Sequence, residues 1–187
     1  TNNLTNSLRF RSSASAYLNR TFGTPTSAQI MTYSGWTKRG KLGQDSFLLY
    51  ENPAGGSGAD HAFIFFTSSD TLRVGAGSGG ASQLDLTTTQ VFRDPSAWYH
   101  IVVIFDTTQA TAANRVRIYV NGNQITAFSS ATYPSQNANL KLNSANPHFI
   151  GAYTIPTQAY YDGYMTDIYW IDGQALEPYY FGSNDSN

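Results

Sequence analysis

The dipeptide Asn121-Gly122 constrains the fold more strongly than any other feature of the chain. A two-residue hairpin turn that matches the twist of its strands needs positive φ at both central positions, and Asn-Gly adopts that conformation at little cost. The turn sets a register that places Ile118 opposite Ile125. Residues 116–127 are therefore predicted to form a hairpin with one apolar face and one wet face.

The segment before the hairpin, residues 99–105, is apolar on both faces of a strand. One face carries Tyr99, Ile101, Val103 and Phe105, and the other carries His100, Val102 and Ile104. A strand of this kind needs cover on both sides. We therefore expect it to lie centrally in a sheet whose outer face is covered by loops, a third layer or a neighbouring subunit.

The length and composition predict one domain that spans residues 1–187. A chain of 187 residues can bury roughly 70% of its unfolded surface in a single core. Charged residues make up 12% of the chain, so the surface must be polar but largely uncharged. A net charge of −1 does not indicate the clustered positive charge that binding to nucleic acid or to an anionic membrane requires.

The chain contains no cysteine, which excludes disulfide scaffolds and thiolate metal sites. Its apolar runs are far shorter than the roughly 20 residues of a membrane helix, and we expect no signal peptide within residues 1–187. It begins at Thr1 rather than Met, so we expect a chain that is either trimmed or cut from something longer.

Short alternating segments recur along the chain with a turn signal about every 10 residues, and no long helical periodicity interrupts them. The segments are residues 7–11, 16–20, 29–38, 46–51, 61–67, 71–74, 84–93, 99–105, 115–128 and 160–172. This pattern predicts an all-β fold, a two-sheet antiparallel β-sandwich with at most short helical turns. The first two segments are near enough to pair with each other, and the basic cluster at residues 38–41 is expected to be a solvated turn.

The C-terminal half gives three further expectations. Residues 129–146 should be mostly loop with a short edge strand at 140–142. In the last long strand, Ile168 and Trp170 should share one face, with Met165, Tyr169 and Ile171 on the other. Residues 174–181 should form at most a short helix that packs against an end of the sandwich.

No catalytic constellation is predicted. Gly75 to Gly80 match G-x-G-x-x-G, but the dinucleotide fingerprint needs a helix after it, and residues 83–92 alternate like a strand. The histidines are dispersed, and His100 lies between apolar strand neighbours where a packed imidazole is the common case. Glu51 and Glu177 are the only glutamates, so no paired carboxylates for glycoside hydrolysis are evident.

With catalysis not indicated, ligand binding is the remaining class of function, and the candidate ligand-binding residues are in two loops. Tyr153, Tyr160 and Tyr161 flank residues 154–159, where aromatic rings can stack on sugar C–H faces. Asp60 and His61 end the glycine-rich connection 52–60 and can add hydrogen bonds. The alternative for the tyrosines is core or interface packing, and for Asp60 and His61 a surface pair without a ligand.

Several motifs together carry a family resemblance. They are Ser34-Gly35-Trp36, FRDPSAWYH at residues 92–100, the YVNG turn at 119–122, HFIG at 148–151, YDGY at 161–164 and IDGQAL at 171–176. With NSLRF at residues 6–10, the chain resembles the LamG-like branch of the concanavalin A-like lectin/glucanase superfamily, in the version found in tailed-phage virion proteins.

The resemblance implies a concanavalin A-like jelly roll and a non-enzymatic virion surface module, on a tail, fibre or capsid, that binds host surface glycans or neighbouring virion proteins as a homo-oligomer. The alternatives are an architectural decoration protein without sugar binding, a carbohydrate-binding module of a secreted bacterial protein located outside the cell, and an atypical polysaccharide depolymerase. The E-x-D-x-x-E strand of the glucanase branch is absent, so catalysis is not carried over. No cofactor is expected; for the calcium of some members, Asp106 and Asp162 are the conceivable equivalents.

Overall fold

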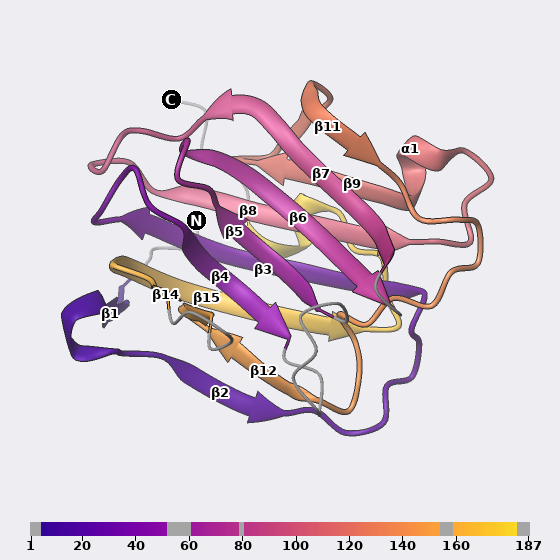
Figure 1. Cartoon of the computed structure of the whole chain (residues 1–187), viewed down its shortest axis with the longest axis horizontal. Helices are drawn as coiled ribbons and strands as arrows, with labels where there is room; N and C mark the ends of the chain where they lie inside the picture. Colours follow the sequence, from indigo (N-terminus) through magenta and orange to yellow (C-terminus); the bar gives the residue numbers. More distant parts are fainter. Residues whose placement is uncertain (1–4, 52–60, 79–80, 154–158, 183–187) are drawn as a thin grey trace.

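A computed structural model of the chain describes residues 5–51, 61–78, 81–153 and 159–182. Two antiparallel sheets face each other across an apolar core (Figure 1). The elements in chain order are β1 (Leu8–Phe10), η1 (Ser12–Ala14), β2 (Leu18–Thr21), β3 (Ile30–Arg39), β4 (Ser46–Glu51), β5 (Ala62–Phe66), β6 (Thr71–Ser78), β7 (Ala81–Val91), β8 (Tyr99–Asp106), α1 (Ala112–Arg115), β9 (Val116–Val120), β10 (Asn123–Ile125), β11 (Phe128–Thr132), β12 (Pro147–Ile150), β13 (Ala152–Tyr153), β14 (Ala159–Tyr160), β15 (Gly163–Asp172) and η2 (Pro178–Phe181).

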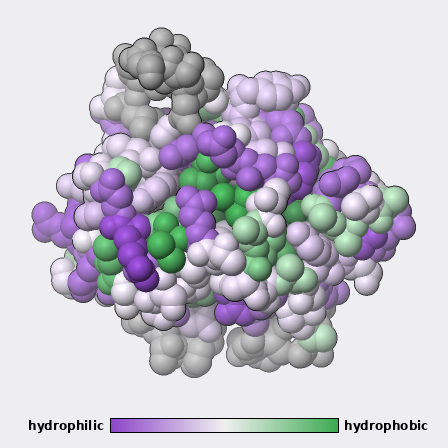
Figure 2. All heavy atoms as spheres, turned by 90° about the horizontal axis from the view of Figure 1, so that it is seen from above, coloured by the Kyte–Doolittle hydropathy of each residue, from purple (hydrophilic) through white to green (hydrophobic). Residues whose placement is uncertain are grey.

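Sheet A has the strand order β1-β15-β3-β8-β9-β10, and sheet B has the order β11-β7-β6-β5-β4-β12-β2. The short hairpin β13-β14 forms a separate two-stranded sheet. The predicted two-sheet antiparallel sandwich is thus confirmed. None of the helices in the described part of the chain is long and apolar enough to cross a membrane. Seen from above (Figure 2), the molecule presents hydrophilic and near-neutral residues around a small group of hydrophobic ones.

The turn, its register and the place of the preceding strand are as predicted, but the hairpin is shorter: β10 ends at Ile125, and Tyr119 on the face expected to be wet is buried beside Val102 and Ile104. Asn121 and Gly122 have φ of 51° and 78°, and Ile118 pairs with Ile125. Strand β8 lies between β3 and β9, and its residues 101, 103 and 105 are buried in the core between the sheets. The two-faced pattern therefore marks a central strand.

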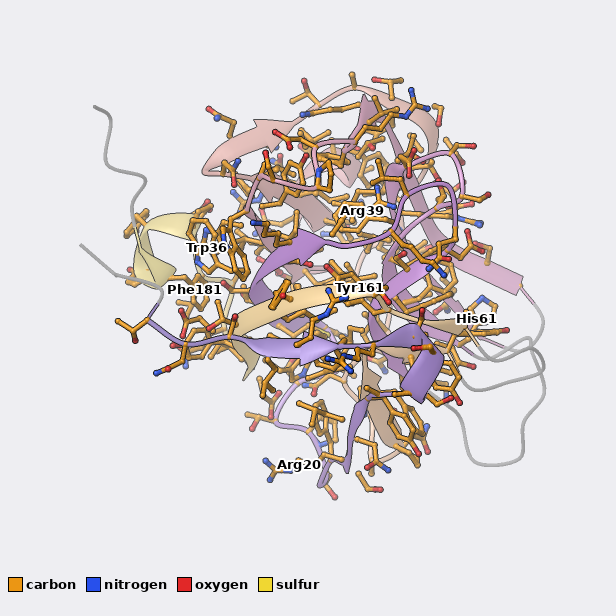
Figure 3. The ribbon with its side chains drawn as sticks, turned by 90° about the vertical axis from the view of Figure 1, so that its left-hand side faces the viewer. Arg20, Trp36, Arg39, His61, Tyr161 and Phe181 are labelled. Carbon is orange, nitrogen blue, oxygen red and sulfur yellow. The ribbon has the colours of Figure 1, made fainter. Side chains whose placement is uncertain are left out.

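The outer face of β8 is covered by the C-terminal segment of the same chain. Val102 and Ile104 form a second apolar cluster, against which Ala175 and Phe181 pack. Figure 3 shows Phe181 on this side of the sandwich. The segment 174–181 was expected at an end of the sandwich; it instead lies on the outer face of sheet A, because the apolar face of β8 must be removed from water.

The face prediction for the last strand is wrong for Met165 because of a bulge, whereas Tyr169 does lie on the face opposite Ile168 and Trp170. The pairing of β15 with β3 shifts register between Thr166 and Tyr169, and Asp167 has φ of 47°. An inserted residue turns the following side chains to the other face. Met165 therefore packs in the same core as Ile168 and Trp170, rather than opposite them.

The strand pairings at the chain's beginning and middle also differ from expectation. Strands β1 and β2 do not pair with each other: β1 pairs with β15 in sheet A, and β2 pairs with β12 in sheet B. The edge strand of the 129–146 region is β11, which pairs with β7. Leu140 and Leu142 are buried in the core from a loop, so their apolar character reflects packing rather than strand formation. The glycine-rich run leads from β6 into strand β7, not into a helix.

The basic cluster at residues 38–41 contains a buried charge. Arg39 is 1% exposed, its Nη2 lies 3.0 Å from Asp70 Oδ1, and its Nη1 donates to the Phe92 carbonyl. Arg93 pairs with the other oxygen of Asp70, and the Gly43 amide donates to Asp70 as well. The solvated-turn prediction is therefore wrong for Arg39, which joins the end of β3 in sheet A to the β5–β6 turn of sheet B.

This junction gives a stability prediction. Burial alone would raise the pKa of Asp70, but bonds from Gly43, Arg93 and Arg39 outweigh it and lower the pKa. We expect Asp70→Asn to lower the free energy of unfolding by about 3 kcal/mol, because it leaves Arg39 buried without its counter-charge. Asp85→Asn, which breaks the more exposed pair with Arg73, should cost below about 1 kcal/mol. Urea unfolding of both variants measures the difference, and equal losses would contradict it.

A second prediction concerns acid stability. His100 is buried on the outer face of sheet A, with Nε2 2.9 Å from Ser34 Oγ and its ring 4.7 Å from that of Trp36. Burial lowers the pKa of His100 from 6.5 to about 4. The unfolded chain then binds the proton more tightly, so this contribution to stability is present above pH 6.5 and is lost as the pH falls toward about 4. His100→Gln should flatten the loss of unfolding free energy across that window; an unchanged pH profile would refute this.

Candidate functional site

A cleft opens between the two sheets at one edge of the sandwich. Strand β1 pairs with β15 only at residues 163–165, so the later part of β15 forms the edge of sheet A. Beneath it, sheet B extends outward through the four-residue strands β12 and β2. The cleft has a volume of about 510 Å³. We call it the edge cleft; it is lined by Leu18, Asn19, Arg20, Phe22, Gly23, Thr24, Pro25, Tyr33, Leu49, Asn143, His148, Ile150, Ile168, Trp170 and Asp172.

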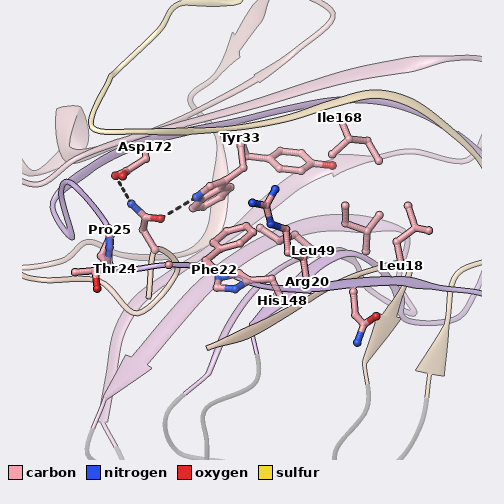
Figure 4. A pocket seen from close by; sticks show the side chains of 15 residues that line it. Leu18, Arg20, Phe22, Thr24, Pro25, Tyr33, Leu49, His148, Ile168 and Asp172 are labelled. Carbon is pink, nitrogen blue, oxygen red and sulfur yellow. Dashed lines mark hydrogen bonds between the residues drawn. The ribbon is translucent and has the colours of Figure 1, made fainter. Parts of the chain in front are cut away.

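Aromatic rings form much of the cleft wall (Figure 4). Phe22 stacks on His148 with ring centroids 3.9 Å apart, and Trp170 lies 6.2 Å from Phe22. Tyr33 reaches the cleft from β3 in the opposite sheet. Flat amphipathic rings of this kind suit the apolar C–H faces of a polar ligand.

One end of the edge cleft is held by Asn143. Its Nδ2 donates to the Ser27 carbonyl and to Asp172 Oδ1, and its Oδ1 accepts from Trp170 Nε1. Asp172 also accepts from the amides of Thr26 and Ser27. Burial alone would raise the pKa of Asp172, but these donors outweigh it and lower the pKa, so the carboxylate stays charged in the cleft wall.

His148 is a fixed part of the wall. Its Nδ1 lies 2.8 Å from the Asn146 carbonyl oxygen and its Nε2 lies 2.8 Å from that of Leu142. Burial lowers the pKa of His148, while the two carbonyl bonds oppose that shift. Both ring nitrogens thus face backbone carbonyl oxygens, and the neutral imidazole, which has one N–H, donates to one of them. The imidazole therefore offers its ring face rather than a nitrogen to the cleft.

The sequence-predicted binding residues lie elsewhere, on the outer face of sheet B. Tyr153 and Tyr160 are half-buried on β13 and β14, where each pairs with an alanine, so their rings lie on opposite faces of the two strands and Tyr160 stacks on Tyr17 instead. Tyr153 packs on Phe47 and Tyr50 with centroids 4.8 and 4.6 Å away. His61 is half-buried before β5, at the surface on the side away from Phe181 in Figure 3, and Asp60 lies outside the described residues.

Tyr161 requires a correction. It is 0% exposed, and its hydroxyl is bonded to Thr37 Oγ1 and to the Lys38 carbonyl at 2.5 and 2.9 Å. Figure 3 shows it inside the molecule. Tyr161 therefore packs in the core, the alternative that the sequence also allowed, and does not reach a ligand beside Tyr160.

Sequence reasoning missed the residues that line the edge cleft. Arg20 and Phe22 belong to β2 and the loop after it, Tyr33 to β3, and Trp170 to β15. These segments are separated by up to about 150 residues, so no local spacing brings them together. The alternation in residues 29–38 assigns Tyr33 to one face of its strand. It does not indicate that this face borders a cleft.

The calcium expectation does not fit the two aspartates. Asp106 accepts hydrogen bonds from Thr108 and Gln109 within its own turn, and Asp162 binds Arg9 and Ser12. Neither forms an open ligand set. Across residues 5–51, 61–78, 81–153 and 159–182, no group of three or more His, Cys, Asp or Glu side chains is arranged to hold a metal ion.

The Asn143 network gives a prediction for the cleft. Asn143→Ala should lower the free energy of unfolding by about 2 kcal/mol, because it strands the Trp170 indole N–H and the Ser27 carbonyl. Asn139→Ala, at an exposed asparagine that bonds only to Gln29, is the matched control and should change stability by about 0.5 kcal/mol or less. Chemical unfolding followed by tryptophan fluorescence distinguishes them; a neutral Asn143→Ala would show that the network is dispensable.

Solved structures of three kinds share this fold. The chain resembles a heptameric SAP-like pentraxin from Limulus polyphemus (TM-score 0.60, 13% identity, 88% of this chain and 73% of that one). It also resembles the CBM40 of the IT-sialidase of Ruminococcus gnavus bound to α2,6 sialyllactose (TM-score 0.59, 13% identity, 89% and 96%). A Trypanosoma rangeli sialidase matches at a TM-score of 0.53 with 17% identity over 82% of this chain, but over 22% of its own length.

Identities this low establish the fold alone. A comparison with curated protein sequences found no match. A family model does match, over residues 11–178, and it covers all the strands from β2 to β15. The chain belongs to this family, Laminin_G_3, of the concanavalin A-like lectin/glucanases superfamily.

Proposed function

We propose that the chain is a non-enzymatic glycan-binding module whose sugar-binding site is the edge cleft. The observation that carries the proposal is the cleft itself, about 510 Å³ in volume and lined by aromatic rings with a few polar groups. Its size falls within the range of roughly 300–1,000 Å³ for small-ligand sites. A shallow aromatic site with few charges suits a neutral or weakly charged polar ligand such as a sugar.

The comparisons support the class of ligand. The CBM40 that binds sialyllactose matches along 96% of its chain, so a domain of this architecture and size suffices to bind a glycan. The sialidase is matched over only 22% of its chain, and its activity is not transferred. The described residues also offer no open carboxylate pair at the cleft, where Asp172 is tied to Asn143.

The wider setting of the proposal is the surface of a virion, where the module contacts host glycans. Its support is the sequence resemblance, carried by NSLRF at residues 6–10 and FRDPSAWYH at 92–100. In the structure these motifs are structural: Phe10 packs edge-on against Tyr161, and Phe92 packs against Phe66. A secreted carbohydrate-binding module is the alternative setting, and immunogold labelling of particles distinguishes the two. No metal cofactor is required by the proposal.

A glycan array tests the proposal. The protein should bind one or more glycans, and Phe22→Ala should weaken that binding at least about fivefold, because it removes a stacking face worth about 1 kcal/mol. Tyr179→Ala, at an aromatic residue that is 67% exposed and outside the cleft, should leave the affinity unchanged. Binding that is insensitive to Phe22→Ala would move the site away from the cleft, and chromatographic detection of cleaved glycan would overturn the non-enzymatic assignment.

A subunit contact is the second candidate function, and one observation favours it. Tyr169, Tyr179 and Tyr180 are 45%, 67% and 60% exposed, and the rings of the latter two are 4.4 Å apart. Exposed tyrosines gathered in this way are typical of protein interfaces. A concentration-dependent oligomer in light scattering that dissociates on Tyr179→Ala, together with a blank glycan array, would favour an architectural role.

A further inference from the structure

Several hydrogen-bonding side chains of the edge cleft make no hydrogen bond with the described residues: Asn19 and Thr24 at the exposed rim, and Arg20 and Tyr33, which face each other across the cleft. Arg20 is exposed at the cleft and makes no hydrogen bond or ion pair with the residues that the structure describes. Tyr33 is 2% exposed, and its hydroxyl likewise has no hydrogen-bond partner among the described residues. By contrast, Asn143 uses its Nδ2 and Oδ1 on the fold, and both ring nitrogens of His148 point at backbone carbonyls rather than into the cleft.

Arg20 and Tyr33 enter the cleft from opposite sheets. Arg20 lies on β2 directly across from His148 on β12, and both side chains line the cleft. Tyr33 comes from β3 in sheet A. In Figure 4 the guanidinium of Arg20 projects from the wall formed by β2 toward the Tyr33 ring, whereas Asp172, to which Asn143 is bonded, lies at the other end.

The chemistry of the pair selects a ligand group. A guanidinium presents parallel N–H donors in a planar fork, which matches the two oxygens of a carboxylate. Burial raises the pKa of the Tyr33 phenol, so this hydroxyl stays protonated and acts as a donor. The Tyr33 hydroxyl bonds to no described residue, so a bound acceptor adds a hydrogen bond, worth about 0.5–1.5 kcal/mol net, without breaking one within the fold.

We propose that the edge cleft binds an acidic sugar, whose carboxylate is held by the Arg20 guanidinium and accepts a hydrogen bond from the Tyr33 hydroxyl. The proposal rests on the proposed glycan-binding function and narrows its ligand class. One cation and one neutral donor match a group with a single negative charge, whereas a sulfate ester would leave further oxygens against the apolar residues Leu49 and Ile168.

Asp172 sets the direction in which the sugar lies. Its carboxylate repels a second negative charge but accepts hydrogen bonds from sugar hydroxyls. A carboxylate at the Arg20 end and hydroxyls at the Asp172 end therefore match the polarity of the cleft. The side chains of Leu18, Leu49 and Ile168 lie beside the Arg20 end in Figure 4. In the proposed complex they contact the C–H groups of the sugar ring.

The test compares a carboxylated glycan with its carboxyl-reduced form. An array that carries neutral, carboxylated and sulfated glycans identifies the best carboxylated ligand, which is then titrated by calorimetry before and after reduction of its carboxylate to a hydroxymethyl group. Reduction should weaken binding about tenfold or more to the native protein, and Arg20→Gln should remove that difference. Arg20→Lys should restore only part of it, because a lysine lacks the planar fork.

Tyr33→Phe and Arg11→Gln complete the design. Tyr33→Phe should weaken the acidic glycan about three- to tenfold while leaving the folded protein intact, since the lost hydroxyl has no partner in the fold. Arg11→Gln, at an exposed arginine outside the cleft, should change nothing. An NMR titration with labelled arginine side chains should shift the Nε–H signal of Arg20 and not that of Arg11.

The outcomes distinguish the acidic-sugar proposal from the more general proposal that the cleft binds a glycan. Glycans that bind at the cleft with equal affinity before and after carboxyl reduction would overturn the acidic ligand and leave the glycan-binding function standing. A preference for sulfated over carboxylated glycans that depends on Arg20 would overturn the carboxylate assignment. If no glycan of any class binds and the Nε–H signal of Arg20 does not shift, both proposals fail.

Discussion

The contact between Arg39 and Asp70 is the interaction on which the closed end of the sandwich depends. It joins the end of β3 in sheet A to the β5–β6 turn of sheet B, and Phe92 and Arg93 are bonded to the same pair. Removing one partner of a buried ion pair leaves an uncompensated charge, which is strongly destabilising. Separating the two sheets at this end would therefore raise the free energy of the protein considerably. This end of the molecule is therefore closed by electrostatics as well as by apolar packing.

The edge beside β2 is organised in the opposite way. Asn143 closes one end of the edge cleft by satisfying Trp170, Ser27 and Asp172, whereas Arg20 and Tyr33 face the space at the other end without using their donors on the fold. Most buried polar groups in proteins are hydrogen-bonded, so donors that line a cleft and make no bond with the fold are suited to a ligand. This contrast between the two ends of the cleft is the basis of the proposed ligand orientation.

Both outer faces of the sandwich carry apolar residues, and each has its own cover. The C-terminal segment covers Val102 and Ile104 on sheet A, and β13-β14 packs against Phe47 and Tyr50 on sheet B. Of the three tyrosines that the sequence proposes for sugar binding, Tyr153 belongs to this second cover, Tyr160 stacks on Tyr17, and Tyr161 lies in the core between the sheets.

Local sequence determined the features that depend on neighbouring residues. The Asn121-Gly122 turn set the register of its hairpin, alternation on both faces identified β8 as a central strand, and the strand pattern after the glycine run excluded a dinucleotide site. Tertiary structure decided the rest. The bulge at Asp167 reverses the faces of the strand after it. The burial of Arg39 depends on a turn that approaches from the other sheet. The edge cleft exists only because β2 and β15, some 150 residues apart, end beside each other. Such meetings are set by the packing of two layers, which no local pattern encodes.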